Sequence, residues 1–245
     1  MRVLLKISYL GTNYHGWQVQ PNGITVQEEL QNAVESLYQS RLGITGCSRT
    51  DSGVHANEYF CHYDTDKYIR EEGIIAALNI ALPNDIAVID CKYVDDAFHA
   101  RYSSKGKEYV YNIYTSKTPN PFMYGRCLHI SKELDVEKMN RFANDLVGTY
   151  DFIAFSSSGR TVTDTVRTIY NCEVLQNEDV ITVKISADGF LYNMVRIIVG
   201  TLIDVSDGKI DYTSAKRIIE SKNRSLAGFT AAPQGLFLNK VFYQE

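Results

Sequence analysis

The chain has few cysteines, few histidines and no cysteine pair, and these shortages exclude several classes of protein. Its five cysteines are odd in number, are spread over residues 47–172 and include no C-x-x-C pair, which argues against a disulfide framework and against a structural zinc site. The five histidines are scattered and add no metal-ligand spacing. We therefore expect a cytoplasmic protein with reduced thiols and no bound metal.

Long apolar runs and an excess of basic residues are also missing. The longest apolar candidate, residues 194–203, is too short to span a membrane and contains Arg196. The N-terminus lacks an apolar core followed by a cleavage site, so we expect no signal peptide. The net charge of −4 gives none of the basic footprint of a typical nucleic-acid-binding domain. Any RNA-binding surface must therefore be a local basic cleft on an acidic body.

What is present is an ordinary globular composition arranged in two similar halves. The 245 residues favour one or two domains with a buried core, and we expect two. Each half mixes strands, mostly joined by hairpins, with helices. This pattern predicts an α+β fold with helices on one face of the sheets, rather than a doubly wound parallel fold. The halves are expected at 1–115 and 122–245, joined by a linker at 116–121 where two prolines interrupt the pattern.

The predicted elements follow from alternation, caps and breakers. Thr25 and Glu28 form a capping box before a helical stripe, Pro83 stops a second helix, and Asp135 caps a third. Strands are predicted at 3–9, 54–63, 86–94, 107–114, 165–175, 180–187 and 236–243, and helices from 26, at about 71–82, from 135 to Gly148, at about 190–205 and at about 212–221.

The most informative segment, residues 46–56 (GCSRTDSGVHA), places Arg49 and Asp51 two residues apart in a glycine-bounded loop. Asp and Ser before Gly form turns through local side-chain hydrogen bonds, and the residues that follow are typical of a strand. On local chemistry alone this is an ordinary Asx-type turn, in which Arg49 could merely brace its own loop. The segment also presents one carboxylate at the end of a sheet.

Arg196 is the second informative residue, because it lies in the almost wholly apolar helical segment 194–200. An arginine buried there would need a partner, since an unpaired buried charge costs several kcal/mol. The alternative is a side chain that reaches the solvent at the helix edge.

A third candidate region surrounds Tyr109 on a predicted strand. Because the chain has 17 tyrosines, aromatic packing is the plain interpretation of this residue. The neighbouring segment has four basic or imidazole side chains against one acid, Glu108, and these are His99, Arg101, Lys105 and Lys107. They form either a local basic surface or a solvated charged face.

Together these segments resemble the tRNA pseudouridine synthase A family. Residues 46–56 resemble its signature G-x-x-R-T-D-x-G-V-H-A, and residues 190–200 its pattern F-x-x-x-M-V-R-x-x-V-G. The blocks that begin at 98 and 224 also resemble family blocks, so the resemblance runs from residue 3 to residue 243. Cys47, Ser48, Ser52 and Ala232 depart from the usual pattern. We expect these departures to affect the range of substrates rather than the reaction.

The resemblance implies a uridine-to-pseudouridine isomerase without a cofactor, built from two ferredoxin-like halves whose sheets adjoin around a central cleft. It implies that Asp51 is the catalytic residue, that Arg196 pairs with it, and that Tyr109 contacts the target base. Arg49 is a candidate wedge beside the extruded base, and Gly235 suits close approach to a base. The implied substrate is the tRNA anticodon stem-loop at positions 38, 39 and 40, held by a homodimer. Whether Asp51 attacks the ribose, attacks the base or removes a ribose proton stays open.

Two other functions fit the same residues. One is a tRNA-binding or tRNA-folding protein that has lost turnover, which the presence of Asp51, Tyr109 and Arg196 argues against. The other is a pseudouridine synthase that acts on a different RNA.

Overall fold

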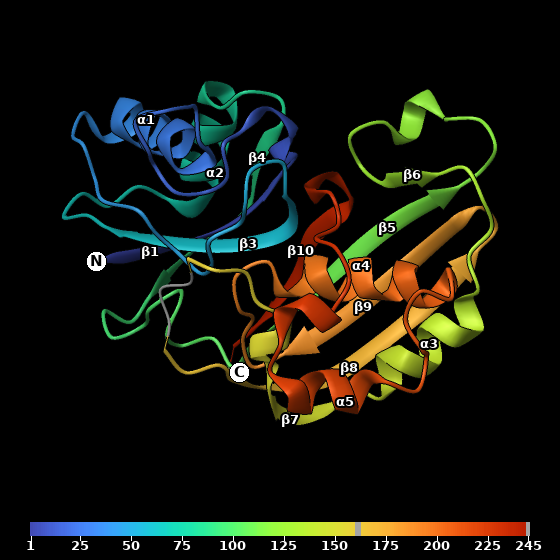
Figure 1. The fold of residues 1–245 in the computed structure, drawn as a ribbon. Helices are drawn as coiled ribbons and strands as arrows, with labels where there is room; N and C mark the ends of the chain where they lie inside the picture. The colour runs from blue at the N-terminus through green and yellow to red at the C-terminus, as the bar shows by residue number, and fades with distance from the viewer. Residues whose placement is uncertain (160–162, 244–245) are drawn as a thin grey trace. The chain divides into compact units, whose positions relative to one another are not determined.

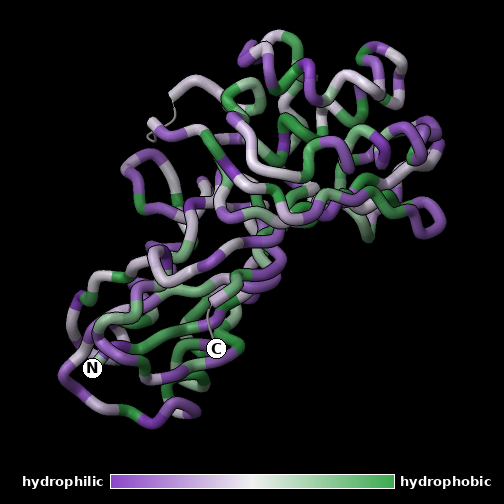
Figure 2. The backbone as a smooth tube through the Cα atoms, turned by 90° about the horizontal axis from the view of Figure 1, so that it is seen from below, coloured by the Kyte–Doolittle hydropathy of each residue, from purple (hydrophilic) through white to green (hydrophobic). Residues whose placement is uncertain are grey.

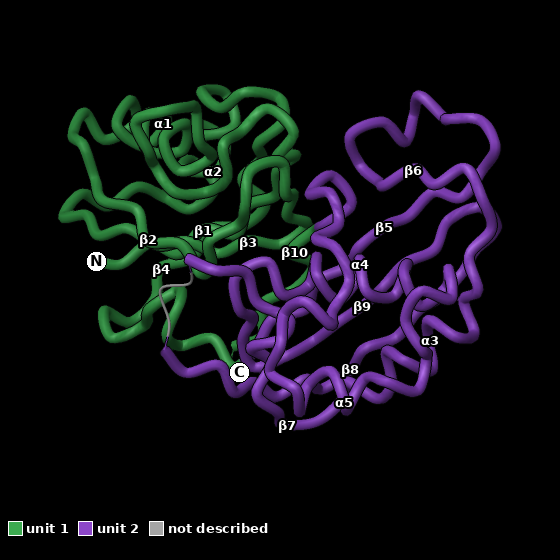
Figure 3. Tube along the Cα trace, viewed as in Figure 1, with its two compact units in different colours: residues 1–105, 237–245 green, residues 106–236 purple. Residues whose placement is uncertain are grey.

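The computed structural model describes residues 1–159 and 163–243, and these residues form two compact units (Figure 3). Unit 1 comprises Met1–Lys105 with Phe237–Glu245, and unit 2 comprises Gly106–Leu236. The sequence-based boundary differs from this division, since the expected linker at 116–121 lies inside unit 2. The reason is that strand β5 (Gly106–Thr115) pairs along its length with β9 (Val180–Ala187) of unit 2.

Unit 1 is a sheet covered by two helices. Its strands follow the order β4-β1-β3-β10, with β2 paired to β3. The bounds are β1 Arg2–Tyr9, β2 Thr45–Gly46, β3 His55–Asp64, β4 Ile86–Val94 and β10 Leu236–Phe242, with α1 Val26–Tyr38 and α2 Glu71–Ala81. Strand β1 is antiparallel to both of its neighbours, whereas β10 joins β3 in parallel. Helices α1 and α2 contact each other over one face of the sheet (Figure 1).

The core of unit 1 follows directly from the periodicity of the sequence. Val3, Leu5 and Ile7 alternate along β1 and are fully buried, as expected for one face of a sheet. The predicted cap of α1 is confirmed, because the Thr25 hydroxyl accepts a hydrogen bond from the Glu28 amide at 3.3 Å.

Unit 2 repeats the architecture with three helices. Its strands follow the order β5-β9-β8-β7, with β6 parallel to β5. The bounds are β5 and β9 as above, β6 Leu128–Ile130, β7 Gly148–Asp151, β8 Val166–Asn177, α3 Val136–Asn144, α4 Met194–Ser206 and α5 Ala215–Ser221. Figure 1 shows α4 and α5 in front of β8 and β9, and α3 packs against both β8 and α4. Both units therefore confirm the predicted α+β class.

Three predicted helix ends are corrected by local backbone geometry. Helix α3 ends at Asn144 rather than reaching Gly148, which has a φ of +131° and begins β7. Helix α4 begins four positions after residue 190, because Asn193 takes a left-handed conformation (φ 61°). Helix α5 begins at Ala215, because the Asp211 carboxylate accepts bonds from both the amide and the hydroxyl of Thr213. These short polar turns compete with the helix.

Figure 2 shows short hydrophobic stretches that alternate with hydrophilic ones along the chain. Within residues 1–159 and 163–243, no helix is long and apolar enough to cross a membrane.

Helix α4 approaches the segment 227–231 so closely that glycine is required. A methyl group added at Gly200 would lie 1.9 Å from the carbonyl oxygen of Phe229, and one added at Gly228 would lie 2.6 Å from the Thr201 Cα. The Thr201 hydroxyl accepts a hydrogen bond from the Gly228 amide at 2.9 Å. This contact holds the segment 227–231 against the buried face of α4.

We predict that Gly200→Ala destabilises the protein by about 2 kcal/mol, since a contact with backbone cannot be relieved by a rotamer change. In an open helix the same substitution stabilises by about 1 kcal/mol. Gly73→Ala in α2 is the matched control, because its nearest neighbouring atom would lie at 3.5 Å. Urea unfolding measures both variants, and an equal gain in stability at the two positions would contradict the close contact.

Candidate functional site

The loop that carries Arg49 and Asp51 is fixed by buried contacts with the loop after β1. The hydroxyls of Thr50 and Tyr9 share a buried hydrogen bond of 2.8 Å, and the Thr50 carbonyl accepts the amide of Trp17 at 3.1 Å. Gly16 has a φ of +85°, and a side chain there would meet the Thr50 carbonyl oxygen at 2.6 Å. The backbone on either side of Thr50 is therefore held in place, while Arg49 is exposed and Asp51 is half-buried.

The predicted turn is present after Asp51. The Val54 amide donates to the Asp51 carbonyl at 3.1 Å, and Gly53 takes a φ of +77°. The Ser52 hydroxyl and the Gly53 amide both donate to the carbonyl of Tyr14, at 3.2 and 3.3 Å. The turn thus directs the chain into β3 immediately after the carboxylate.

Three aromatic residues that the sequence did not single out support this loop. Trp17 and Tyr59 stack with their ring centroids 4.1 Å apart, and Tyr9 lies 5.7 Å from Tyr59. The Tyr59 hydroxyl donates to the carbonyl of Ser48, and burial raises the pKa of that hydroxyl well above its usual value. From the sequence, Tyr9 and Tyr59 could have been found as aromatic residues on the buried faces of predicted strands.

His55 and the loop at 95–103 have structural roles in unit 1. The His55 Nδ1 accepts the amide of Gly11 at 2.9 Å, and its ring stacks on Phe237, as expected for a residue that braces its strand. In the loop, the His99 Nδ1 accepts the amides of Arg101 and Tyr102 at 3.1 and 3.2 Å. These bonds shape a compact turn that leaves the Arg101 side chain exposed.

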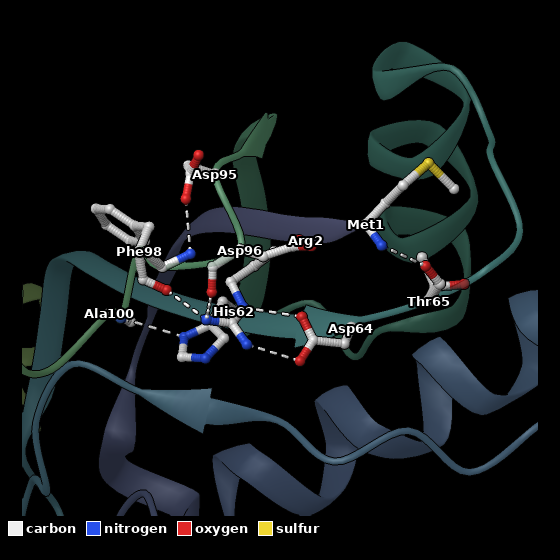
Figure 4. Close-up of polar contacts among 10 residues, drawn as sticks. Met1, Arg2, His62, Asp64, Thr65, Asp95, Asp96, Phe98 and Ala100 are labelled. Atoms are coloured by element: carbon white, nitrogen blue, oxygen red, sulfur yellow. Dashed lines mark hydrogen bonds and ion pairs between the residues drawn. The ribbon is translucent and has the colours of Figure 1, made fainter.

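The loop at 95–103 is tied to the sheet by a charged network (Figure 4). The Arg2 guanidinium forms two 2.8 Å hydrogen bonds with the Asp64 carboxylate and also donates to the carbonyls of Asp96 and Phe98. The His62 Nδ1 accepts the Ala100 amide at 3.2 Å. Bidentate arginine pairs of this kind fix geometry as well as adding energy. They hold the loop that presents Arg101, which is followed by the exposed Lys105.

In unit 2, Arg196 lies in the first turn of α4 and is half-buried. Its Nε donates to the Ala231 carbonyl at 2.7 Å, and its Nη1 donates to the Asn193 side-chain oxygen at 2.9 Å. A cation in the first helical turn is disfavoured by the helix dipole. These two acceptors fix the guanidinium there.

The segment around Ala231 connects Arg196 to Tyr111 of β5. The Ala232 carbonyl accepts the Tyr111 hydroxyl at 2.6 Å, and a side chain at Gly235 would lie 2.6 Å from the Tyr111 ring. Burial raises the pKa of Tyr111, and the nearby Arg196 opposes that rise. Contact with Tyr111 therefore accounts for glycine at position 235.

Tyr109 lies on the same face of β5 as Tyr111, and its ring meets the edge of Phe190 at 5.0 Å between centroids. It is 7% exposed, whereas Lys107 on that face is half-buried. Glu108 points to the opposite face, where Lys184 lies 3.6 Å from its carboxylate. Glu108, the one acid in the predicted basic segment, thus forms an ion pair with a lysine of the neighbouring strand β9.

The predicted site residues are divided between the two units. Unit 1 contains Arg49, Asp51, Arg101 and Lys105, and unit 2 contains Lys107, Tyr109, Arg196 and Gly235. The pairing of Asp51 with Arg196 stays a prediction. Within the part of the chain that the structure describes, no group of three or more His, Cys, Asp or Glu side chains could hold a metal ion.

Comparison with known proteins identifies the family. The family model described as tRNA pseudouridine synthase matches residues 6–103 and 142–244. The chain belongs to the tRNA pseudouridine synthase family. The resemblance found in the sequence is thereby confirmed, and with it membership of a family of isomerases.

Relatives in this family match the chain over nearly its whole length. The tRNA pseudouridine synthase A of Thermoanaerobacter sp. (strain X514) is 48% identical over 241 residues, which are 98% of this chain and 99% of that protein. The tRNA pseudouridine synthase A of Bacillus subtilis (strain 168) is 44% identical over 245 residues, 99% of each. A chain from the crystal structure of a Cbf5-Nop10-Gar1 complex aligns with 98% of this chain and 50% of its own, at 11% identity and a TM-score of 0.39.

We predict that His62 makes the stability of this synthase-family member sensitive to acid. Burial lowers its pKa to about 4, with Arg2 and His99 acting in the same direction and Asp64 opposing them. Below its usual pKa of about 6.5, the histidine binds a proton in the unfolded protein but not in the folded one. The contribution of His62 to the free energy of unfolding is therefore fully present above pH 6.5 and is lost as the pH falls towards 4.

His62→Asn tests this, because an amide oxygen can still accept the Ala100 amide but does not titrate. Urea midpoints measured from pH 7 to pH 4.5 should fall less steeply in the variant than in the wild-type protein. Parallel profiles would contradict the role of His62.

Proposed function

We propose that the protein isomerises uridine to pseudouridine at positions 38, 39 and 40 in the anticodon stem-loop of tRNA. The observation that carries the proposal is the Asp51 loop, in which buried hydrogen bonds at Thr50 and the turn at Gly53 fix the backbone that carries the half-buried Asp51. Family membership and relatives named tRNA pseudouridine synthase A support the reaction and the substrate.

The reaction needs one carboxylate rather than two. The bond from ribose C1′ to uracil N1 breaks, the base turns, C5 bonds to C1′, and the C5 proton is lost while N1 gains one. Because the product is an isomer, no cofactor and no water are consumed. Hydrolytic glycosidases instead pair two carboxylates with water. The role of Asp51 is to act on the sugar or the base as nucleophile or base, in a site that retains the detached uracil.

Arg196 and Tyr109 complete the proposed site. Arg196 pairs with Asp51 as the counterion of its carboxylate. Its bonds to the Ala231 carbonyl and the Asn193 side chain hold the guanidinium at the start of α4. Tyr109 contacts uracil with its ring and offers its hydroxyl for proton transfer, and the edge contact with Phe190 fixes the ring.

The remaining basic residues bind the RNA. Arg101, Lys105 and Lys107 are assigned to phosphates, which position the RNA without reading its sequence. The target uridine must leave its stack, at a cost of a few kcal/mol that is smallest in loops and at stem ends. The exposed Arg49, two residues before Asp51, is assigned to the position that the uridine vacates, because guanidinium planes stack on bases.

We further propose that the protein acts in the cytoplasm as a homodimer that binds one tRNA across both subunits. Both parts rest on the resemblance to the tRNA pseudouridine synthase A family, and the buried thiols of all five cysteines are compatible with a reducing compartment.

We predict that Asp51→Asn lowers the rate of isomerisation by about a thousandfold or more and changes tRNA affinity by less than about threefold, because phosphate contacts dominate binding. Tritium release from tRNA labelled at uridine C5 measures the rate, and filter binding measures the affinity. Asp66→Asn, at an exposed position in the same unit, is the control. Wild-type protein that binds tRNA but releases no tritium would favour a binding or folding function instead.

We predict that Arg196→Met lowers kcat because Asp51 loses its proposed partner, and that the effects of Arg196→Met and Asp51→Ala on stability are not additive. Urea unfolding of the two single variants and the double variant measures the coupling. Additive effects would show that the two side chains do not meet, and would assign Arg196 only to the support of the segment at Ala231.

A further inference from the structure

The segment 116–132, which connects β5 to α3 and contains β6, displays two large aromatic side chains to solvent. Phe122 is 81% exposed and Tyr124 is 85% exposed. We call this segment the 116–132 loop, and Figure 1 shows it as an excursion beyond the end of β5. Two highly exposed aromatic residues this close in the sequence favour an interaction surface.

Hydrogen bonds fix the backbone at the tip of the 116–132 loop. The Asn120 side chain accepts the Phe122 amide at 3.0 Å, and the Tyr124 amide donates to the Pro121 carbonyl at 3.2 Å. The guanidinium of Arg126 donates to the carbonyl of Phe122. These bonds preset the backbone that presents both rings, which reduces the entropy lost on binding.

The base of the loop is anchored to the sheet. Strand β6 pairs in parallel with β5 from Ile113 opposite Leu128 onwards, and the His129 ring and the Ser116 carbonyl lie within hydrogen-bond distance at 2.8 Å. The tip is therefore held at a fixed place on unit 2.

The charge of the loop differs from that of the whole protein. Residues 116–132 contain no Asp or Glu, although acidic residues exceed basic ones by four in the chain. Lys117 and Arg126 are exposed, whereas Lys132 pairs with Asp207 at 2.5 Å. Of the nearby acids, Asp179 lies at the base of the loop, where its carbonyl accepts the Thr115 amide.

Cations interleaved with exposed aromatic rings fit a nucleic acid better than a second copy of this chain. Bases stack on aromatic side chains, and neighbouring lysines and arginines bind the backbone. A two-fold contact between copies would instead bring the same cations together. The loop also lies between the two stretches that match the family model, 6–103 and 142–244, so that match assigns it no role.

We propose that the 116–132 loop is a second RNA-binding surface, in which Phe122 and Tyr124 stack on unpaired bases and Lys117 and Arg126 bind adjacent phosphates. The identity of the RNA as a tRNA substrate rests on the proposed function. The loop increases the affinity for RNA without contacting the reacting uridine. Changes in the loop should therefore alter KM and Kd but not kcat.

The double variant Phe122→Ala/Tyr124→Ala tests the stacking. We expect KM and Kd for unmodified tRNA to rise by about tenfold for each ring removed, while kcat changes by less than twofold. Phe122→Trp should restore affinity because it restores a stacking surface. Tyr68→Ala is the matched control, since Tyr68 is 60% exposed and lies in unit 1, outside the 116–132 loop. Lys117→Gln should lower the slope of log Kd against log salt by slightly less than one.

Three results would overturn the proposal. The first is an unchanged Kd in the double variant, and the second is a fall in kcat at unchanged Kd. The third is a double variant that sediments as a smaller species than the wild-type protein but binds tRNA normally. That result would make the loop a contact between copies of the chain. Kd is measured by filter binding and needs no turnover. Loss of tRNA affinity in the variant, in a protein whose wild type forms no pseudouridine, would therefore support the loop and refute only the proposed reaction.

Discussion

The hydrogen bond between Tyr9 and Thr50 is the contact on which the candidate catalytic loop depends. It joins the end of β1 to the residue before Asp51, and both hydroxyls are buried. Buried polar groups of this kind are costly when unpaired, so the pair favours one loop conformation over others. Tyr59, whose ring stacks on Trp17, donates its hydroxyl to the Ser48 carbonyl in the same loop. A short polar turn, which would be mobile alone, becomes part of the core.

The Arg196 guanidinium, the second part of the candidate site, is held by backbone groups rather than by side-chain packing. Arg196 stands where the helix dipole disfavours a cation, and its Nε is held by the Ala231 carbonyl. That carbonyl is placed by the close approach of the segment 227–231 to α4, which requires Gly200 and Gly228. The glycines therefore determine the position of the guanidinium indirectly, because they allow a carbonyl to reach it.

Periodicity predicted most of the fold, because β1, α1 and the β8–β9 hairpin bury one regular face each. The starts of α4 and α5 could not be predicted this way. Asn193 and Asp211 divert the backbone through local conformations that compete with helix. The boundary at 116–121 was drawn from composition, whereas long-range pairing of β5 with β9 decides which unit contains β5. Motifs located the candidate side chains, but their supporting aromatics required the tertiary structure.

An acidic protein can bind a polyanion even when many of its cations form ion pairs that stabilise the fold, provided that a few cations contact the ligand. Arg2 is committed to Asp64, and Lys132 to Asp207. Yet Arg2 also ties down the loop that presents Arg101, through the carbonyls of Asp96 and Phe98. The Asp64 carboxylate orients the Arg2 guanidinium and so helps to fix the loop that carries Arg101. An ion pair that stabilises the fold therefore also determines where an exposed cation lies.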